Sequence, residues 1–118
     1  MDESRPIFMQ IAEQLESQII DGSLVEEAQV PSINDLAAFH RINPATALKG
    51  INLLVDAGVL YKQRGIGMFV ASGARERLIA RRKAAFHETY VRPVVAQARA
   101  IGISPDELAQ LIRKEAQR

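Results

Sequence analysis

The apolar positions of the chain repeat with a helical period over much of its length. Between Pro6 and Asp21 an apolar residue returns at every fourth position, at Ile7, Ile11, Leu15 and Ile19. This spacing predicts an amphipathic helix, with Pro6 suited to its first turn and Gly22 suited to its end. Residues 23–30 lose the helical period, and we expect this segment to pair briefly as a strand.

Two helix starts follow, each marked by its own capping residues. Ser32 stands three residues before an aspartate, the spacing of a capping box, in which a side-chain oxygen accepts from an unpaired N–H group at a helix start. It predicts a helix over residues 33–40. Asn43 is a favoured N-cap and Pro44 a favoured first helical residue, so the pair predicts a second helix over residues 44–57.

A short hairpin is predicted after the second helix. Gly58 can take the left-handed conformation that closes a helix. Residues 59–62 and 68–71 are rich in β-prone side chains, and residues 65–67 can turn the chain between them. The order helix, turn, helix, hairpin is typical of a winged helix-turn-helix, which places one helix in the DNA major groove and a β-ribbon beside it. We therefore expect a mostly α fold with a small β-wing, in a DNA-binding domain spanning residues 1–72.

Residues 73–118 are predicted to form a separate helical tail. A helix over residues 74–100 should be kinked or split at Pro93, which lacks a backbone donor, and a last helix should begin after Ser104. Two such helices carry more apolar residues than they can cover alone, so we expect a second copy of the chain to bury them in a two-fold dimer. The expected dimerisation residues are Leu78, Phe86, Tyr90, Val94, Leu108, Leu111 and Ile112. The alternative is that the tail folds back on its own DNA-binding domain.

Composition places the chain among globular proteins. It has 118 residues, of which 47% are hydrophobic and 25% charged, and it has no cysteine, which excludes disulfides and thiolate metal sites. No apolar run is long enough to span a membrane, and the first residues lack the basic-then-apolar order of a signal peptide. We expect a cytoplasmic protein with no membrane partner.

The charges are distributed unevenly along the chain. Residues 1–70 carry nine acidic and five basic side chains, whereas residues 71–118 carry five acidic and ten basic ones. A DNA-binding domain usually has a basic surface, so the acidic first part argues against DNA binding. Placement weakens this objection, because seven of the nine acids precede position 28. The cations of the predicted helix-turn-helix and hairpin are Arg41, Lys49, Lys62 and Arg64, and a basic run follows at Arg75, Arg77, Arg81, Arg82 and Lys83.

Several side chains of the predicted helix-turn-helix and wing suit contact with double-stranded DNA. Thr46 offers a hydroxyl for phosphate and a methyl for thymine, and Lys49 suits guanine acceptors or phosphate. Arg64 and Gly65 would place a cation and a close-approaching backbone at the wing turn. The expected DNA-binding residues are Ser32, Asn34, Arg41, Asn43, Ala45, Thr46, Lys49, Arg64 and Gly65. In the alternative interpretation Asn43 is only a cap, and the charged residues are solvated surface groups.

Nothing in the sequence indicates catalysis. His40 and His87 lie far apart, and neither has a nucleophile motif or metal-ligand spacing around it. Asp106 and Glu107 are adjacent, so they do not share a helix face, and acids at a helix start have a structural explanation. A metal site at His87, Glu88 and Tyr90 is weakly supported. We expect no catalytic residue, no metal and no cofactor.

The motifs of residues 5–71 resemble the GntR-type bacterial transcriptional regulators. The matching residues are Pro31, Ser32, Leu36, Ala37, Asn43, Pro44, Thr46, Leu54, Gly58, Leu60, Gly65, Gly67, Phe69 and Val70. The short two-helix tail is similar to that of the YtrA-type branch. The resemblance implies a repressor that binds a palindromic operator as a homodimer.

Two positions depart from the pattern of that family. Asn34 stands where the family usually has a DNA-contacting arginine, and Lys49 stands where an arginine is often found. Both changes weaken contacts to phosphate or guanine. A dimeric adaptor that no longer binds DNA is therefore the alternative function. A small-molecule effector, if one acts on this protein, is expected between tail and DNA-binding domain or at the dimer interface.

Overall fold

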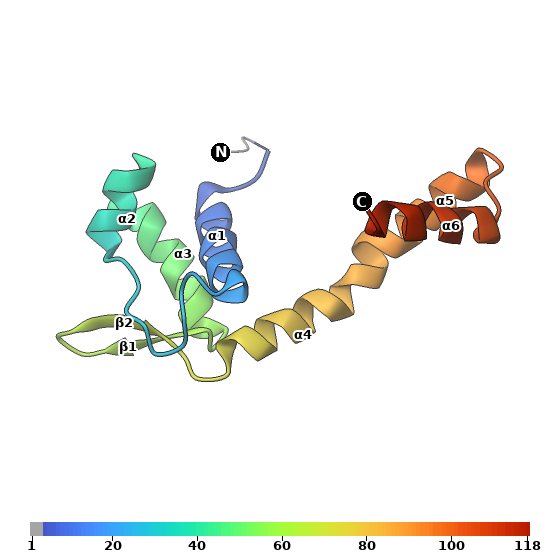
Figure 1. Cartoon of the computed structure of the whole chain (residues 1–118). Coiled ribbons are helices and arrows are strands. Elements are labelled where there is room, and N and C mark those ends of the chain that lie inside the picture. Colours follow the sequence, from blue (N-terminus) through green and yellow to red (C-terminus); the bar gives the residue numbers. More distant parts are fainter. Residues whose placement is uncertain (1–3) are drawn as a thin grey trace. The chain divides into compact units, whose positions relative to one another are not determined.

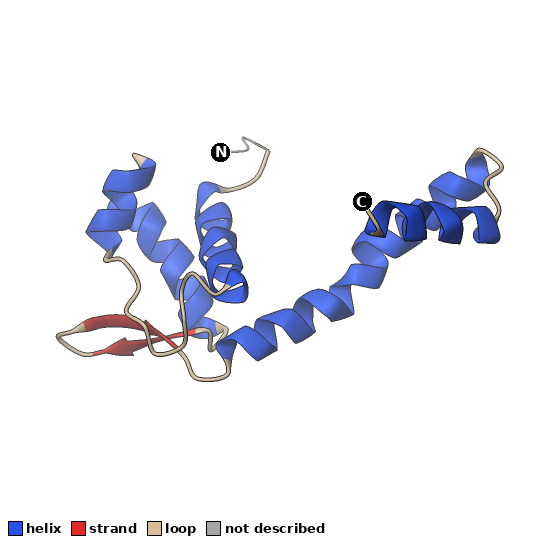
Figure 2. Ribbon diagram, viewed as in Figure 1, coloured by secondary structure: helices blue, strands red, loops and turns tan. Residues whose placement is uncertain are grey.

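The computed structural model of the protein describes residues 4–118 and is mostly helical, with one small antiparallel hairpin (Figure 1, Figure 2). Its elements are α1 (Ile7–Asp21), α2 (Ile33–His40), α3 (Pro44–Asp56), β1 (Leu60–Gln63), β2 (Gly67–Val70), α4 (Ala74–Phe86), the π-helical turn η1 (His87–Val91), α5 (Arg92–Ala100) and α6 (Pro105–Ala116). This order confirms the predicted fold class, a helix-turn-helix with a β-wing followed by a helical tail. The chain divides into two compact units, residues 1–79 and residues 80–118.

The helix starts are capped at the predicted residues, although at Ser32 the structure shows only the serine half of the expected capping box. The Ser32 hydroxyl accepts from the Asp35 N–H group at 3.1 Å, and the Asn43 side-chain oxygen accepts from the Ala45 N–H group at 2.8 Å. At the start of α6, Ser104 and Glu107 form a reciprocal capping box. Each cap satisfies a backbone donor that has no partner within its helix, which explains why these helices begin where the sequence places them.

The first unit has one hydrophobic core, to which all three of its full helices and the hairpin contribute. Its buried residues are Ile11, Ala12, Leu15, Ile19, Val30, Leu36, Ala37, Ala47, Ile51, Leu54, Val59, Leu60, Val70, Ala74 and Leu78. Helices α1 and α3 are in close contact at Gly50, where an added Cβ would lie 2.8 Å from the Phe8 carbonyl oxygen. The buried face of α3 is thereby turned toward α1 and α2, and its opposite face is left exposed.

The wing is the antiparallel pair β1–β2, with Leu60 opposite Val70 and Gln63 opposite Gly67. The segment before α2 pairs with its outer edge, because Gln29 forms an isolated bridge with Phe69. The sequence prediction that residues 23–30 pair briefly as a strand is therefore confirmed at Gln29. The extra pairing supports a hairpin that two short strands could not stabilise alone.

The second unit consists of the later part of α4, followed by η1, α5 and α6. The predicted long helix is split before Pro93, which lies in the first turn of α5, and η1 bridges the two parts. At this point the Arg92 N–H group donates to the His87 carbonyl five residues earlier. Helices α5 and α6 pack against each other, yet Ala98 is the one hydrophobic residue of residues 80–118 that the structure buries.

The start of α4 belongs to the core of the first unit, contrary to two sequence expectations. Leu78 is only 1% exposed and lies among that core, so it has no surface to offer a second copy of the chain. The compact units divide between Ile79 and Ala80 rather than between residues 72 and 73. Two arginines of the basic run attach the start of α4 to the rest of the first unit. Arg75 donates to the Ile20 carbonyl at 2.9 Å, and Arg77 donates to the Gly58 carbonyl at 2.6 Å.

Truncation of Leu78 tests its place in the core. We expect Leu78→Ala to lower the free energy of unfolding of the first unit by about 2–5 kcal/mol, because it leaves a cavity in a packed interior. Urea denaturation of the full chain measures this loss. The control is Leu53→Ala on α3, where the side chain is 41% exposed and the loss should stay below about 1 kcal/mol. Equal losses of stability in the two variants would contradict the assignment of Leu78 to the core of the first unit.

Candidate nucleic-acid interface

The residues expected to contact DNA all lie in the first unit, at the ends of its elements. Ser32 and Asn34 lie at the start of α2, and Arg41 and Asn43 lie in the turn between α2 and α3. The others are Ala45, Thr46 and Lys49 in the first two turns of α3, and Arg64 and Gly65 in the β1–β2 turn. All of these residues are exposed except Thr46, which is half-buried.

The exposed face of α3 carries little charge. Ala47, Gly50, Ile51 and Leu54 are buried, which leaves the opposite face to Ala45, Leu48, Lys49, Asn52, Leu53 and Asp56. Lys49 and Asp56 are the charged residues of this face, and their charges cancel. Sequence reasoning missed Asn52, although it follows Lys49 by three residues and therefore lies one turn further along the same face. An asparagine amide can pair with adenine in the major groove.

The two caps of the helix-turn-helix keep donors for an outside partner. The Ser32 oxygen and the Asn43 side-chain oxygen each accept from a backbone N–H group. The hydroxyl hydrogen of Ser32 and the amide hydrogens of Asn43 are not needed for capping. Capping and contact with phosphate are therefore compatible at both residues, rather than alternatives.

Lys49 has a neighbour that the sequence did not indicate. Its ammonium group lies over the ring of Phe8 in α1, 4.2 Å from the ring centroid. A cation over an aromatic face at an exposed site is stabilised by about 0.5–1 kcal/mol. The contact follows from the close approach of α1 and α3 at Gly50, the next residue, and no sequence pattern links positions 8 and 49.

The turn between α2 and α3 depends on the backbone conformation at position 41, which is occupied by Arg41. This residue has φ 56° and ψ 51°, a left-handed conformation that glycine adopts more readily. The conformation lets the Ile42 N–H group donate to the Ala37 carbonyl at 2.9 Å, which closes α2. Arg41 is therefore an exposed residue at the junction of the two helices.

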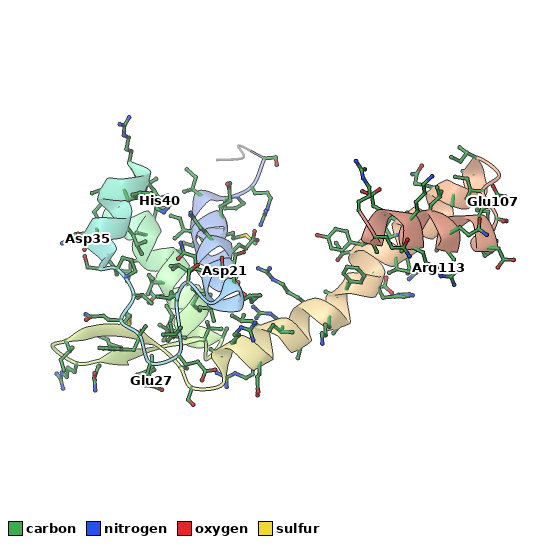
Figure 3. All side chains as sticks on the ribbon, viewed as in Figure 1. Asp21, Glu27, Asp35, His40, Glu107 and Arg113 are labelled. Carbon is green, nitrogen blue, oxygen red and sulfur yellow. The ribbon has the colours of Figure 1, made fainter. Side chains whose placement is uncertain are left out.

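The wing turn presents Arg64 and Gly65 between paired residues. The Ile66 N–H group donates to the Gln63 carbonyl at 2.9 Å, and Gly65 has φ 77°. At the other end of the wing, the Tyr61 hydroxyl donates to the Glu27 carboxylate, whose residue is labelled beside the hairpin in Figure 3. This hydrogen bond raises the pKa of Tyr61.

Away from the wing, the Ser23 hydroxyl and backbone N–H group lower the pKa of Asp21 by donating to its carboxylate.

Other kinds of site have no support among residues 4–118. In that part of the chain no group of His, Cys, Asp and Glu side chains is arranged to hold a metal ion. His40 and His87 belong to different units. None of the described helices is both long enough and apolar enough to cross a membrane.

Comparison with known proteins identifies the class. The family model described as bacterial regulatory proteins, gntR family, matches residues 8–70, which is more than half of the chain. The chain therefore belongs to the GntR family of bacterial regulatory proteins, as its motifs indicated. It is a transcriptional regulator with a winged helix-turn-helix, and its relatives are regulators rather than enzymes.

Individual relatives share either the whole chain or the first unit. A putative GntR-family regulator from Bacteroides thetaiotaomicron is 33% identical, with a TM-score of 0.79 over 95% of this chain and 97% of that one. The HTH-type transcriptional repressor YtrA of Bacillus subtilis (strain 168) is 24% identical over 94% of this chain and 85% of its own length. The DNA-binding domain of AraR, in a crystal structure with operator ORE1, is 33% identical, with a TM-score of 0.55 over 57% of this chain and 82% of that one.

Arg41 offers a test that separates stability from binding. We expect Arg41→Gly to raise the free energy of unfolding by about 1 kcal/mol, because it removes a side chain from a left-handed position. The same change should weaken DNA binding, because it removes a cation from the interface. Urea denaturation and fluorescence anisotropy with labelled duplex measure the two effects.

The control for this experiment is Arg41→Lys. It keeps both the charge and the left-handed conformation of a non-glycine residue, so stability should stay near that of the unchanged protein and binding should be largely retained. If Arg41→Gly binds DNA as tightly as the unchanged protein, Arg41 does not belong to the interface.

Proposed function

We propose that this protein is a repressor that binds a palindromic operator in double-stranded DNA as a homodimer, in the bacterial cytoplasm. The observation that supports DNA contact is the set of exposed donors and cations at the helix-turn-helix and the wing turn. These groups lie on the elements that meet a duplex in winged helix-turn-helix proteins. The similar DNA-binding domain of AraR has been crystallised in complex with operator ORE1.

In this proposal α3 enters the major groove and the wing contacts the neighbouring backbone or minor groove. Thr46, Lys49 and Asn52 face base edges and phosphates from α3, while the Ser32 hydroxyl donates to a phosphate. Arg64 supplies a full positive charge from the wing turn. Asn34 supplies hydrogen-bond donors without a charge, so it adds less to affinity than an arginine would. Each copy therefore binds with modest strength.

The tail is proposed to join two copies, because it cannot cover its own apolar residues. Phe86, Tyr90, Val94, Leu111 and Ile112 are between 42% and 62% exposed. A groove of about 510 Å³ runs between α5 and α6, with Val95, Ile103, Leu108 and Ile112 among its lining. A unit of roughly forty residues with almost no buried core rarely folds stably alone. The tail of a second copy supplies an apolar face that can cover these residues, and the helices of both tails then share one core.

A dimer also explains how a weakly charged α3 can give useful affinity. Once one copy is bound, the second half-site is met at a high effective concentration, so two modest contacts act as one strong contact. Occupancy of a promoter by such a dimer is sufficient for repression. The whole-length likeness to the repressor YtrA supports assignment to the YtrA-type branch. A small-molecule effector is proposed to act at the tail interface, where it would alter the spacing of the two DNA-binding units.

Salt dependence tests the DNA-binding proposal. The affinity for an operator selected from random duplexes should fall by on the order of 10³-fold between about 50 and 200 mM salt. The reason is that lysine and arginine side chains that contact phosphates displace the counterions condensed on DNA, and added salt opposes this release. Arg64→Ala should lower the slope of log affinity against log salt by about one unit for each copy. The control is Arg118→Ala at the end of the chain, where an exposed ion pair with Glu115 is lost. Salt-independent binding, or no preference over random DNA, would favour the adaptor function instead.

A charge placed in the tail tests the dimer. Ile112→Glu replaces an apolar side chain, which is 56% exposed and borders the groove, with a carboxylate. We expect sedimentation velocity to show a monomer, and operator affinity to fall by about 10²-fold or more as the second contact is lost. Gln110→Glu adds the same charge to the same helix and should remain dimeric. A dimer that persists with Glu at position 112 would contradict the proposed interface.

A further inference from the structure

The segment before α2 supports the outer edge of the wing. The Glu27 N–H group donates to the Val70 carbonyl at 2.8 Å, and the Val70 N–H group donates to the Ala28 carbonyl at 3.0 Å. The Val30 N–H group donates to the Met68 carbonyl at 2.9 Å. These bonds hold residues 27–30 along β2 as a partial third strand, so the backbone of Gln29 has a defined place beside the wing.

From that place the Gln29 side chain reaches the wing turn. Its amide nitrogen Nε2 donates to the Ile66 carbonyl at 3.1 Å, across 37 positions of sequence. Ile66 follows Arg64 and Gly65 directly, and its N–H group closes the turn on the Gln63 carbonyl. Ile66 is therefore held on both sides, by Gln63 within the hairpin and by Gln29 from outside it.

Gly67 is the residue that permits this contact. A Cβ built at Gly67 would lie 2.5 Å from Nε2 of Gln29, closer than any real contact allows. Gly67 also has φ 149°, a conformation that residues with side chains rarely adopt. The second glycine of the Gly-x-Gly turn thus leaves room for a side chain that arrives from another part of the chain.

We infer that Gln29 is a positioning residue for DNA binding, which holds the wing turn so that the Arg64 guanidinium reaches the duplex. The inference rests on the proposed DNA-binding function. A three-residue turn with one hydrogen bond of its own has considerable conformational freedom. Ordering the turn on DNA binding costs conformational entropy, which lowers the affinity. The hydrogen bond from Gln29 removes part of that cost before DNA arrives. Gln29 itself need not touch DNA.

The first experiment examines the wing without DNA. Gln29→Met keeps the length of the side chain and removes its donor. In the full chain we expect lower ¹⁵N heteronuclear NOE values at the Arg64, Gly65 and Ile66 amides of the Gln29→Met variant. Gln14→Met makes the same chemical change at an exposed position of α1 and should leave these values unchanged. If Gln29→Met also leaves the wing as ordered as before, the inference is overturned.

The second experiment asks whether Gln29 acts through Arg64. Gln29→Met should weaken binding to the selected operator by about threefold to tenfold, the usual worth of one hydrogen bond. In an Arg64→Ala background the same substitution should cost less than twofold, because the group that it positions is gone. A merely structural role would give equal losses in both backgrounds, and that result would overturn the inference.

The two experiments keep this inference apart from the proposed function. Failure of the unchanged protein to prefer any duplex would overturn DNA binding, while the NOE measurement would still report whether Gln29 holds the turn. Normal operator binding with no loss in Gln29→Met would leave the proposed function standing and overturn the role of Gln29.

Discussion

The close packing of α1 against α3 is the contact on which the DNA-binding unit depends. It is possible because position 50 is glycine, since any larger residue would meet the Phe8 carbonyl oxygen. This contact decides which face of α3 is buried, and therefore which residues remain for a partner. It also brings the Phe8 ring under the Lys49 ammonium group, so one packing contact shapes both the core and the candidate interface. Two residues far apart in sequence acquire their roles from it.

The cations of the chain have separate tasks that a total charge conceals. Arg75 and Arg77 donate to backbone carbonyls at the ends of α1 and α3, and so attach the start of α4 to the first unit. Arg41 and Arg64 lie exposed in turns whose backbone geometry is specified by hydrogen bonds. A domain with an acidic total can therefore still present positive charge where a duplex would lie, because local placement governs contact with phosphate.

The two units differ in how far they complete their own cores. The first encloses a continuous apolar cluster, to which α4 contributes Ala74 and Leu78. The second buries little beyond Ala98 among its described hydrophobic residues. A border between Ser72 and Gly73 would remove two core residues from the first unit, which is why the compact division falls later, after Ile79. The large apolar residues of the tail remain exposed in one chain, and this is the physical basis for proposing a second copy.

The sequence by itself determined where the helices and the hairpin lie, and it supplied most of the residues that are proposed for the candidate interface. Caps at Ser32, Asn43 and Ser104, and the break at Pro93, are local effects of side chains on nearby backbone groups, so they could be predicted without a fold. Which distant groups meet was decided by tertiary structure alone. Leu78 has the periodic spacing of a tail residue, yet it is buried in the first unit, because helical period shows that a face is apolar but not what covers it. Contacts such as Gln29 with Ile66 and Lys49 with Phe8 join residues through chain packing, for which one sequence contains no local signal.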